Sequence, residues 1–122
     1  MIKNKTKKST IVKELEWADT VGKQTLGLMF RGKLESGAGF MMNFKFNRKH
    51  GIWMPFMRFL IDIIFIDKDK RIVDIKHSVL PIGVNPKTWK VYKPKEQCKY
   101  VLEVNAGLMK KTKSHVGDIL EF

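Results

Sequence analysis

Gly51–Asp67, GIWMPFMRFLIDIIFID, is the most apolar stretch of the 122-residue chain. Its second half, Phe59–Asp67, is almost unbroken in apolar residues, which is typical of a strand buried on both faces. Pro55 interrupts the first half, because proline has no N–H to donate to a β-ladder. Arg58 and Asp62 are charged residues inside this apolar surrounding. We therefore predict that the stretch forms the central strand, with a functional rim at its entrance.

Shorter strands are predicted on both sides of this stretch. The turn Asp67-Lys68-Asp69-Lys70 should join it to Arg71–His77 in a hairpin. Further strands are expected at Thr10–Trp17, Phe40–Phe46, Tyr100–Val104 and Ile119–Phe122, and short helices after Ala18-Asp19-Thr20 and over Leu108–Ser114. In the second of these strands, the residues at even positions, Phe40 to Phe46, should all point into the core. This pattern indicates an α+β fold with a mostly antiparallel sheet, curled or forming a partial β-barrel, and one or two short helices.

Length and composition favour one globular domain. A chain of this size buries about 65% of the surface that its unfolded form exposes. We predict a flexible basic tail over residues 1–9 and a single α+β domain over residues 10–122. The sequence has one cysteine, Cys98, and no apolar run long enough for a membrane helix or a signal peptide. These features predict a protein of the cytoplasm, where thiols stay reduced.

The chain is strongly basic, with a formal net charge of +12. Four lysines, Lys3, Lys5, Lys7 and Lys8, fall in the first eight residues. Such a field attracts nucleic acid without sequence preference, and Trp53, Trp89 or Tyr92 could stack on bases. The alternative is that the lysines serve solubility or stability.

Five stretches, in this order, carry a family resemblance: Gly27–Arg31, Trp53-Met54, Asp62–Asp67, Tyr100–Glu103 with Gly107, and Gly117-Asp118. Together they resemble domain of unknown function 192, also called uncharacterised protein family 0127, from about Thr10 to Phe122. The resemblance implies a small α+β domain with a barrel-like sheet and supplies no established reaction. Family members usually read Trp-Met-Lys-Asn-Thr and then Pro-Leu-Asp, where this chain has Trp53-Met54-Pro55-Phe56-Met57 and Leu60-Ile61-Asp62. If that Lys and Asn bind a ligand in relatives, this chain binds it differently or not at all.

Asp62 is the sharpest single candidate, because a carboxylate in an apolar strand is costly unless it is paired or hydrogen-bonded. As a functional group it would anchor a ligand or act as a general base. As a structural group it would pair with Arg31 or Arg58, or accept hydrogen bonds from backbone N–H groups. Arg31 could clamp a carboxylate or phosphate, or lock its helix to Asp62 or Glu103.

The remaining candidates have equally plain alternatives. Trp53 and Met54, with Phe56 and Met57, would line the mouth of a pocket or pack in the core. The methionines could bind Cu(I), but they more often fill gaps in cores. His50, His77 and His115 show no zinc spacing, and we predict no metal and no cofactor. Cys98 is followed by Lys99, which could lower its thiol pKa, or it is an inert filler.

Three hypotheses follow. The first is a binding domain whose pocket, near Arg31, Trp53, Met54, Arg58 and Asp62, takes a small anionic ligand. The second is a nucleic-acid-associated module that uses Lys3, Lys5, Lys7 and Lys8 with Trp89 and Tyr92. The third is an enzyme with Asp62 as general base.

Overall fold

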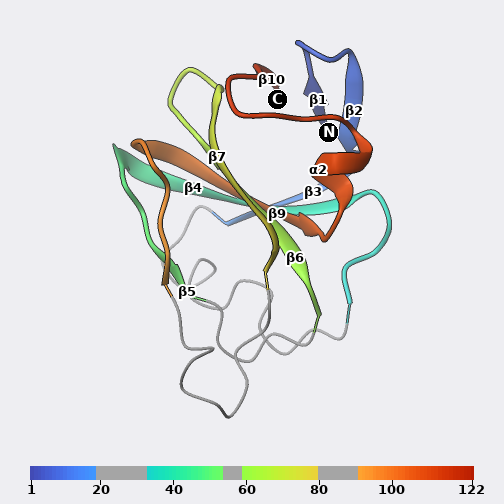
Figure 1. The fold of residues 1–122 in the computed structure, drawn as a ribbon, viewed down its shortest axis with the longest axis horizontal. Helices are drawn as coiled ribbons and strands as arrows, with labels where there is room; N and C mark the ends of the chain where they lie inside the picture. Colours follow the sequence, from blue (N-terminus) through green and yellow to red (C-terminus); the bar gives the residue numbers. More distant parts are fainter. Residues whose placement is uncertain (19–32, 54–58, 80–90) are drawn as a thin grey trace.

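The computed structural model describes residues 1–18, 33–53, 59–79 and 91–122. Within these residues the chain forms strands and one short helix (Figure 1). The strands are β1 (Ile2–Asn4), β2 (Ser9–Val12), β3 (Glu14–Ala18), β4 (Ala38–Arg48), β5 (Ile52–Trp53), β6 (Ile61–Ile66), β7 (Ile72–Val79), β8 (Val91–Tyr92), β9 (Cys98–Asn105) and β10 (Leu120–Glu121), and the helix is α2 (Leu108–Lys111).

The largest sheet has five strands in the order β3-β4-β9-β6-β7. Its pairs are antiparallel except for β3 and β4, which run parallel. The predicted central stretch supplies β6, but the middle of the sheet is β9, so β6 is second from one edge. The predicted hairpin after β6 is confirmed, since the Asp67 backbone N–H donates to the Arg71 carbonyl at 2.9 Å across the turn.

β6 is buried on both faces, as its apolar sequence predicts. Ile61, Ile63 and Phe65 join a first core cluster together with Phe40 and Met42 of β4 and with Ile52 of β5. Ile64 and Ile66 point to the opposite face and join a second cluster with Leu102 and Met109. The five-stranded sheet therefore separates two apolar layers, and the side-chain parity of β6 decides which layer each residue enters.

A second sheet, in the order β10-β1-β2, covers the second cluster together with α2 (Figure 1). Ile2 and Asn4 of β1 are fully buried, and β1 pairs with β10 near the other end of the chain. The prediction of a flexible tail over residues 1–9 is therefore wrong. Its lysines suggested a solvated segment, whereas alternate residues of β1 point inward and complete the core.

The predicted strand Thr10–Trp17 is two strands in different sheets. The chain bends at Lys13, where the backbone N–H groups of Lys13 and Glu14 both donate to the carbonyl of Gly37, at 2.8 and 3.1 Å. This bend lets β2 pair with β1 while β3 pairs with β4. Apolar residues fall at odd positions on both sides of the bend, at Ile11, Leu15 and Trp17, so the pattern favoured one continuous strand.

β4 follows the predicted parity only in its first half. Phe40 and Met42 are buried in the first cluster, and Phe44 packs against it. Phe46, which was expected to point inward, is 53% exposed. The register between β4 and β9 shifts after Asn43, so the last residues of β4 leave the core surface.

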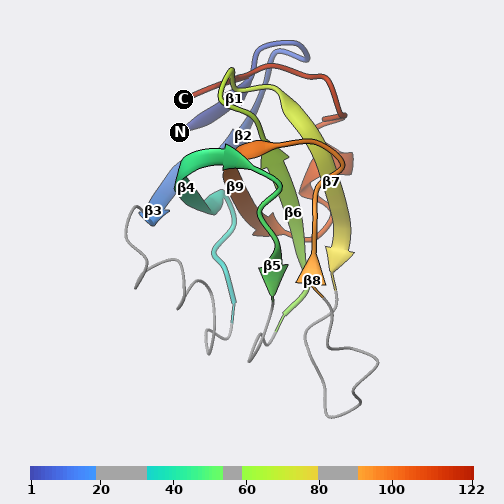
Figure 2. The same ribbon diagram turned by 90° about the vertical axis from the view of Figure 1, so that its left-hand side faces the viewer.

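The α+β fold class with a curled sheet is confirmed, and the strands of the described residues do not close into a barrel. The helix predicted over Leu108–Ser114 appears as the shorter α2, after a turn at Ala106-Gly107, while the helix predicted after Ala18 lies outside the described residues. β5 and β8 pair in a short ribbon, away from β1, β2 and both termini (Figure 2). The helix of the described residues is too short to cross a membrane.

Candidate functional site

The described residues contain part of the predicted site. Asp62 and Tyr92 are placed with their side chains, and Trp53 is placed through its backbone, opposite Val91 in the β5–β8 ribbon. The other predicted residues, Arg31, Met54, Arg58 and Trp89, lie outside the described residues. The contacts of Asp62, and the surface beside Trp53, therefore show which of the predicted roles these parts of the site have.

The Asp62 carboxylate is fully buried and accepts three backbone hydrogen bonds. Ser78 donates to one carboxylate oxygen at 2.8 Å. Gly107 and Met109 donate to the other oxygen at 3.2 and 3.1 Å. Asp62 thus joins β6 to the edge strand β7 and to the first turn of α2. This is one of the structural roles predicted for it, a carboxylate held by backbone N–H groups.

The position of Asp62 follows from strand parity. It alternates with Ile61 and Ile63, so it points to the same layer as Ile64 and towards α2. The helix needs such a partner, because its first N–H groups have no acceptor within the helix. Gly107, at φ 90°, turns the chain so that these N–H groups face the carboxylate.

A groove of about 560 Å³ opens between β7 and β8. Its polar lining is mostly basic and comes from Lys76, His77 and Lys93, with the Tyr92 ring beside them. The Lys76 ammonium pairs with buried Asp74 at 3.1 Å. His77 and Lys93 are exposed, so both can meet a ligand from solvent.

This groove adjoins two of the predicted site residues. Ser78 lines it and gives its N–H to Asp62. Val91 also lines it and is the partner of Trp53 across the β5–β8 ribbon. The sequence reasoning missed Lys76, His77 and Lys93, and the only signal for them was the lysine-rich segment before β9. The segment after β8 is held to β7 by the Lys95 backbone N–H, which donates to Asp74, and no local pattern encodes this long-range contact.

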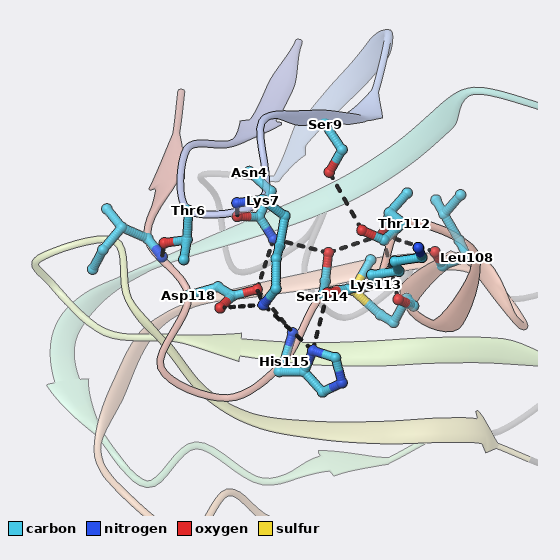
Figure 3. Close-up of polar contacts among 12 residues, drawn as sticks. Asn4, Thr6, Lys7, Ser9, Leu108, Thr112, Lys113, Ser114, His115 and Asp118 are labelled. Atoms are coloured by element: carbon cyan, nitrogen blue, oxygen red, sulfur yellow. Dashed lines mark hydrogen bonds and ion pairs between the residues drawn. The ribbon is translucent and has the colours of Figure 1, made fainter.

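A second polar cluster joins the two ends of the chain (Figure 3). We call Asn4, Lys7, Ser114, His115 and Asp118 the terminal clasp. The amide of Asn4 donates to Ser114 Oγ at 3.0 Å and to Asp118 at 2.9 Å. The Lys7 ammonium and the His115 backbone N–H donate to the same carboxylate, at 2.9 and 3.0 Å. The clasp fixes β1 to the segment before β10.

The clasp determines the protonation of Asp118. Burial alone would raise the pKa of this carboxyl, but the hydrogen bonds from Asn4, Lys7 and His115 outweigh burial and lower the pKa below its ordinary value. Asp118 therefore stays ionised at neutral pH and holds Lys7 in place. Lys7 has a structural partner, which separates it from the other lysines of the predicted nucleic-acid surface.

The other described residues of that surface lie in two separate places. Lys3, Lys5 and Lys8 line a hollow of about 380 Å³ on the β1–β2 hairpin, with Glu121 among them. Tyr92 lines the groove beside β8 instead. The hairpin keeps a basic face, but the described residues place this predicted stacking ring on another part of the molecule.

Cys98 is fully buried in the first core cluster. Burial raises the pKa of its thiol, and this outweighs a hydrogen bond from the His50 backbone that lowers it. The suggestion that nearby lysines lower this pKa is therefore wrong, and the inert-filler interpretation is supported. No group of three or more His, Cys, Asp or Glu side chains within the described ranges is arranged to hold a metal ion.

The fold and these sites define a small α+β domain with a curled sheet, a closed terminal clasp and a basic groove. The family described as "Uncharacterized ACR", domain of unknown function 192, matches residues 2–122. The chain belongs to this family, and the match extends the predicted resemblance to β1.

Relatives include UPF0127 proteins of Thermococcus gammatolerans, 31% identical over all of this chain and 74% of the relative, and of Pyrococcus furiosus, 35% identical over 98% and 95%. A crystal structure titled as a putative transcription regulator from Sinorhizobium meliloti is similar, with TM-score 0.79 and 29% identity, covering 88% of this chain and 79% of that one. A protein of unknown function from Novosphingobium aromaticivorans gives TM-score 0.80 at 28% identity, with 88% and 74% covered.

Proposed function

We propose that this protein is a binding domain that takes a small anionic ligand in the groove between β7 and β8. The observation that carries the proposal is the convergence of Lys76, His77 and Lys93 on one hollow of about 560 Å³. A hollow of this volume falls in the range of small-molecule sites. The Tyr92 ring offers an apolar surface beside these groups.

The choice of an anion rests on the charge of the lining. Among the described residues, the lining of this groove includes no Asp or Glu, and nearby Asp74 is already paired with Lys76. A comparable hollow of about 480 Å³ beside α2 contains Glu35 together with Lys33 and Lys111. The groove at β7 and β8 is therefore the more favourable of the two for negative charge.

The proposal is tested by titrating the ¹⁵N-labelled chain with inorganic phosphate, pyrophosphate and citrate. Amide resonances of Lys76–Val79 and Val91–Lys93 should shift in a saturable way with at least one of these anions. At 100 times the dissociation constant, the same anion should raise the free energy of unfolding by about 2.7 kcal/mol.

Lys93→Glu should abolish this binding, because it reverses a charge in the groove. Lys68→Glu makes the same charge change in the exposed turn between β6 and β7 and serves as the matched control. Equal losses in both variants, or no saturable shift with any of the three anions, would refute a groove site for these ligands.

A second candidate function is association with nucleic acid, favoured by the net charge of +12. The similar Sinorhizobium meliloti protein, described as a putative transcription regulator, adds weight to it. This candidate predicts binding whose logarithm falls linearly with the logarithm of salt concentration. Fluorescence anisotropy with a labelled oligonucleotide over 50 to 300 mM salt measures that slope, and undetectable binding at about 50 mM salt would exclude the function.

A further inference from the structure

We propose that the end of β4 and the segment between β8 and β9 form a single-stranded nucleic-acid surface, with Phe46 as the stacking platform. We call Lys45, Phe46, Arg48, Lys49, Lys93 and Lys95 the basic rim. The inference rests on the second candidate function and gives it a location different from the β1–β2 hairpin. The rim shares Lys93 with the groove proposed for the anion, and its other members lie outside the residues that line that groove.

Phe46 is exposed although residues 39–42, in the first half of β4, are buried. Its ring is 53% exposed, whereas Phe40 is 2% exposed and Met42 is 4% exposed. Burying a phenylalanine side chain is worth about 1.5–3 kcal/mol, so exposure gives up a substantial contribution to folding. An exposed aromatic ring among cations has the composition of a site that stacks on bases.

The backbone that carries Phe46 is held in place. The ring of His50 stacks on Phe44 at a centroid distance of 3.9 Å and an interplanar angle of 11°. His50 Nε2 also lies 2.7 Å from the Phe46 carbonyl, and the His50 backbone N–H donates to the Arg48 carbonyl at 3.0 Å. A fixed backbone lowers the entropy lost when a nucleotide binds.

Cations surround the ring. The Arg48 guanidinium carbon lies 4.8 Å from the centroid of Phe46, and the Lys45 ammonium lies 5.6 Å from it. Arg48, Lys45 and Lys49 are exposed. A base stacked at Phe46 would therefore place its phosphate within reach of several cationic groups.

The segment before β9 extends this surface. Arg48 pairs with Cys98 across the sheet, and the amide of Asn47 donates to Gln97 at 3.2 Å, so the end of β4 and the start of β9 lie side by side (Figure 1). Asp74 accepts the Lys95 backbone N–H at 3.1 Å and holds this segment to β7. Residues 45–51 and 93–99 together contain six Lys or Arg and one carboxylate, Glu96.

The composition of the rim favours nucleic acid over a membrane surface. It contains one exposed aromatic ring and five cations, spread along two neighbouring segments of chain. Membrane attachment needs a broad apolar face, whereas stacking on single strands needs isolated rings between charges. Lys99 is excluded from the rim because its ammonium already bonds Asn43 Oδ1 at 3.0 Å and the Phe44 carbonyl at 2.8 Å.

The test is fluorescence anisotropy of the full chain with 12-nucleotide polythymidylate and polyuridylate at several salt concentrations. Phe46→Ala should weaken binding about 5- to 150-fold, as expected for the loss of one stacked base. Phe46→Trp should preserve binding, and Phe46→Leu should behave like Phe46→Ala, because leucine is apolar without a ring face. The double variant Lys45→Gln/Lys49→Gln should reduce the magnitude of the salt slope by about 1.4, with Lys110→Gln/Lys111→Gln on exposed positions of α2 as the charge-matched control.

The possible outcomes separate the surface from the function. If the parent chain binds neither oligonucleotide at about 50 mM salt, the inference and the second candidate function both fail. If the parent binds, but Phe46→Ala is without effect and Lys3→Gln/Lys5→Gln/Lys8→Gln abolishes binding, the surface is wrong and the function stands. If the rim and α2 double variants lose equal affinity, binding comes from the overall positive charge of the protein, and the proposed surface is wrong. If Phe46→Leu keeps oligonucleotide binding, or the parent prefers phosphatidylserine vesicles to both oligonucleotides, the stacking role is overturned.

Discussion

The terminal clasp and the basic rim use polar side chains in opposite ways. In the clasp, Asn4, Ser114 and Asp118 are buried and bonded to one another or to Lys7. In the rim, the cations and the Phe46 ring face solvent. The comparison shows that the buried polar residues of the clasp stabilise the fold. The basic rim, whose charges are exposed, is the surface that a partner can reach.

Removing residues 1–8 should have the largest effect on this comparison. The deletion takes away the buried Ile2 and Asn4 and the Lys7–Asp118 ion pair, so the free energy of unfolding should fall by roughly 4 kcal/mol or more. Urea denaturation followed by circular dichroism measures the loss. Lys5→Gln/Lys8→Gln, which changes only exposed side chains, should stay within about 0.5 kcal/mol of the parent. An unchanged midpoint in the deletion would show that β1 is dispensable.

Asp62→Ala should give the next largest loss in the free energy of unfolding. It leaves the N–H groups of Ser78, Gly107 and Met109 without their acceptor in a buried site, and we expect a loss of about 3–5 kcal/mol. Hydrogen exchange should show faster opening of α2 than of the hairpin turn at Asp67–Lys70. A variant that keeps the parent stability would contradict the structural role, and the general-base hypothesis would then regain support.

Asp118→Asn should lower the free energy of unfolding by less, about 1.5–3 kcal/mol at pH 7. The asparagine keeps one acceptor oxygen but has no charge. The lowered pKa gives the sign of the pH dependence. The contribution of the ionised carboxylate is present above the unfolded-state pKa of about 3.9 and is lost as pH falls towards the lower folded-state pKa. Stability measured between pH 7 and 2.5 should therefore fall less steeply in Asp118→Asn than in the parent. Parallel curves for the two proteins would mean that Asp118 does not titrate as a clasp residue.

A pair of glycine substitutions makes the smallest and most direct comparison. A Cβ at Gly39 would lie 2.8 Å from a methyl carbon of Val12, which is fully buried, so Gly39→Ala should cost about 1–3 kcal/mol. A Cβ at Gly51 would lie 2.7 Å from Val91, which is 51% exposed and free to move. Gly51→Ala should therefore cost less than about 1 kcal/mol, by the same overpacking rule. Equal costs in thermal unfolding would show that the ribbon at Val91 is as tightly packed as the core.

Local sequence was sufficient for the elements with strong patterns. The apolar run of β6 and the turn at Asp67–Lys70 predicted the hairpin, because burial on both faces and turn chemistry are encoded within a few residues. The parity of β4 held as far as Phe44 and failed at Phe46, because the shift of register with β9 depends on a strand distant in sequence. The pairing of Lys3 and Asn4 depends likewise on β10, at the opposite end of the sequence.

The candidate site was predictable only in part for a related reason. Asp62 stood out as a charge among apolar residues, and one of its predicted alternatives was realised. Lys76, His77 and Lys93 did not stand out in a sequence with 24 Lys and Arg residues. They differ from the other basic residues in lining one groove between β7 and β8, and this arrangement is a property of the tertiary fold.

The pairing of β1 with β10 affects how the protein is made. Ile2–Asn4 leaves the ribosome early, but its partner Leu120–Glu121 is synthesised more than a hundred residues later. Until then, the second core layer is open and Ile2 has no β10 beside it. Closure of this sheet must therefore come late, slowed by the long separation between its strands. During that interval the nascent chain is most exposed to aggregation and to capture by chaperones.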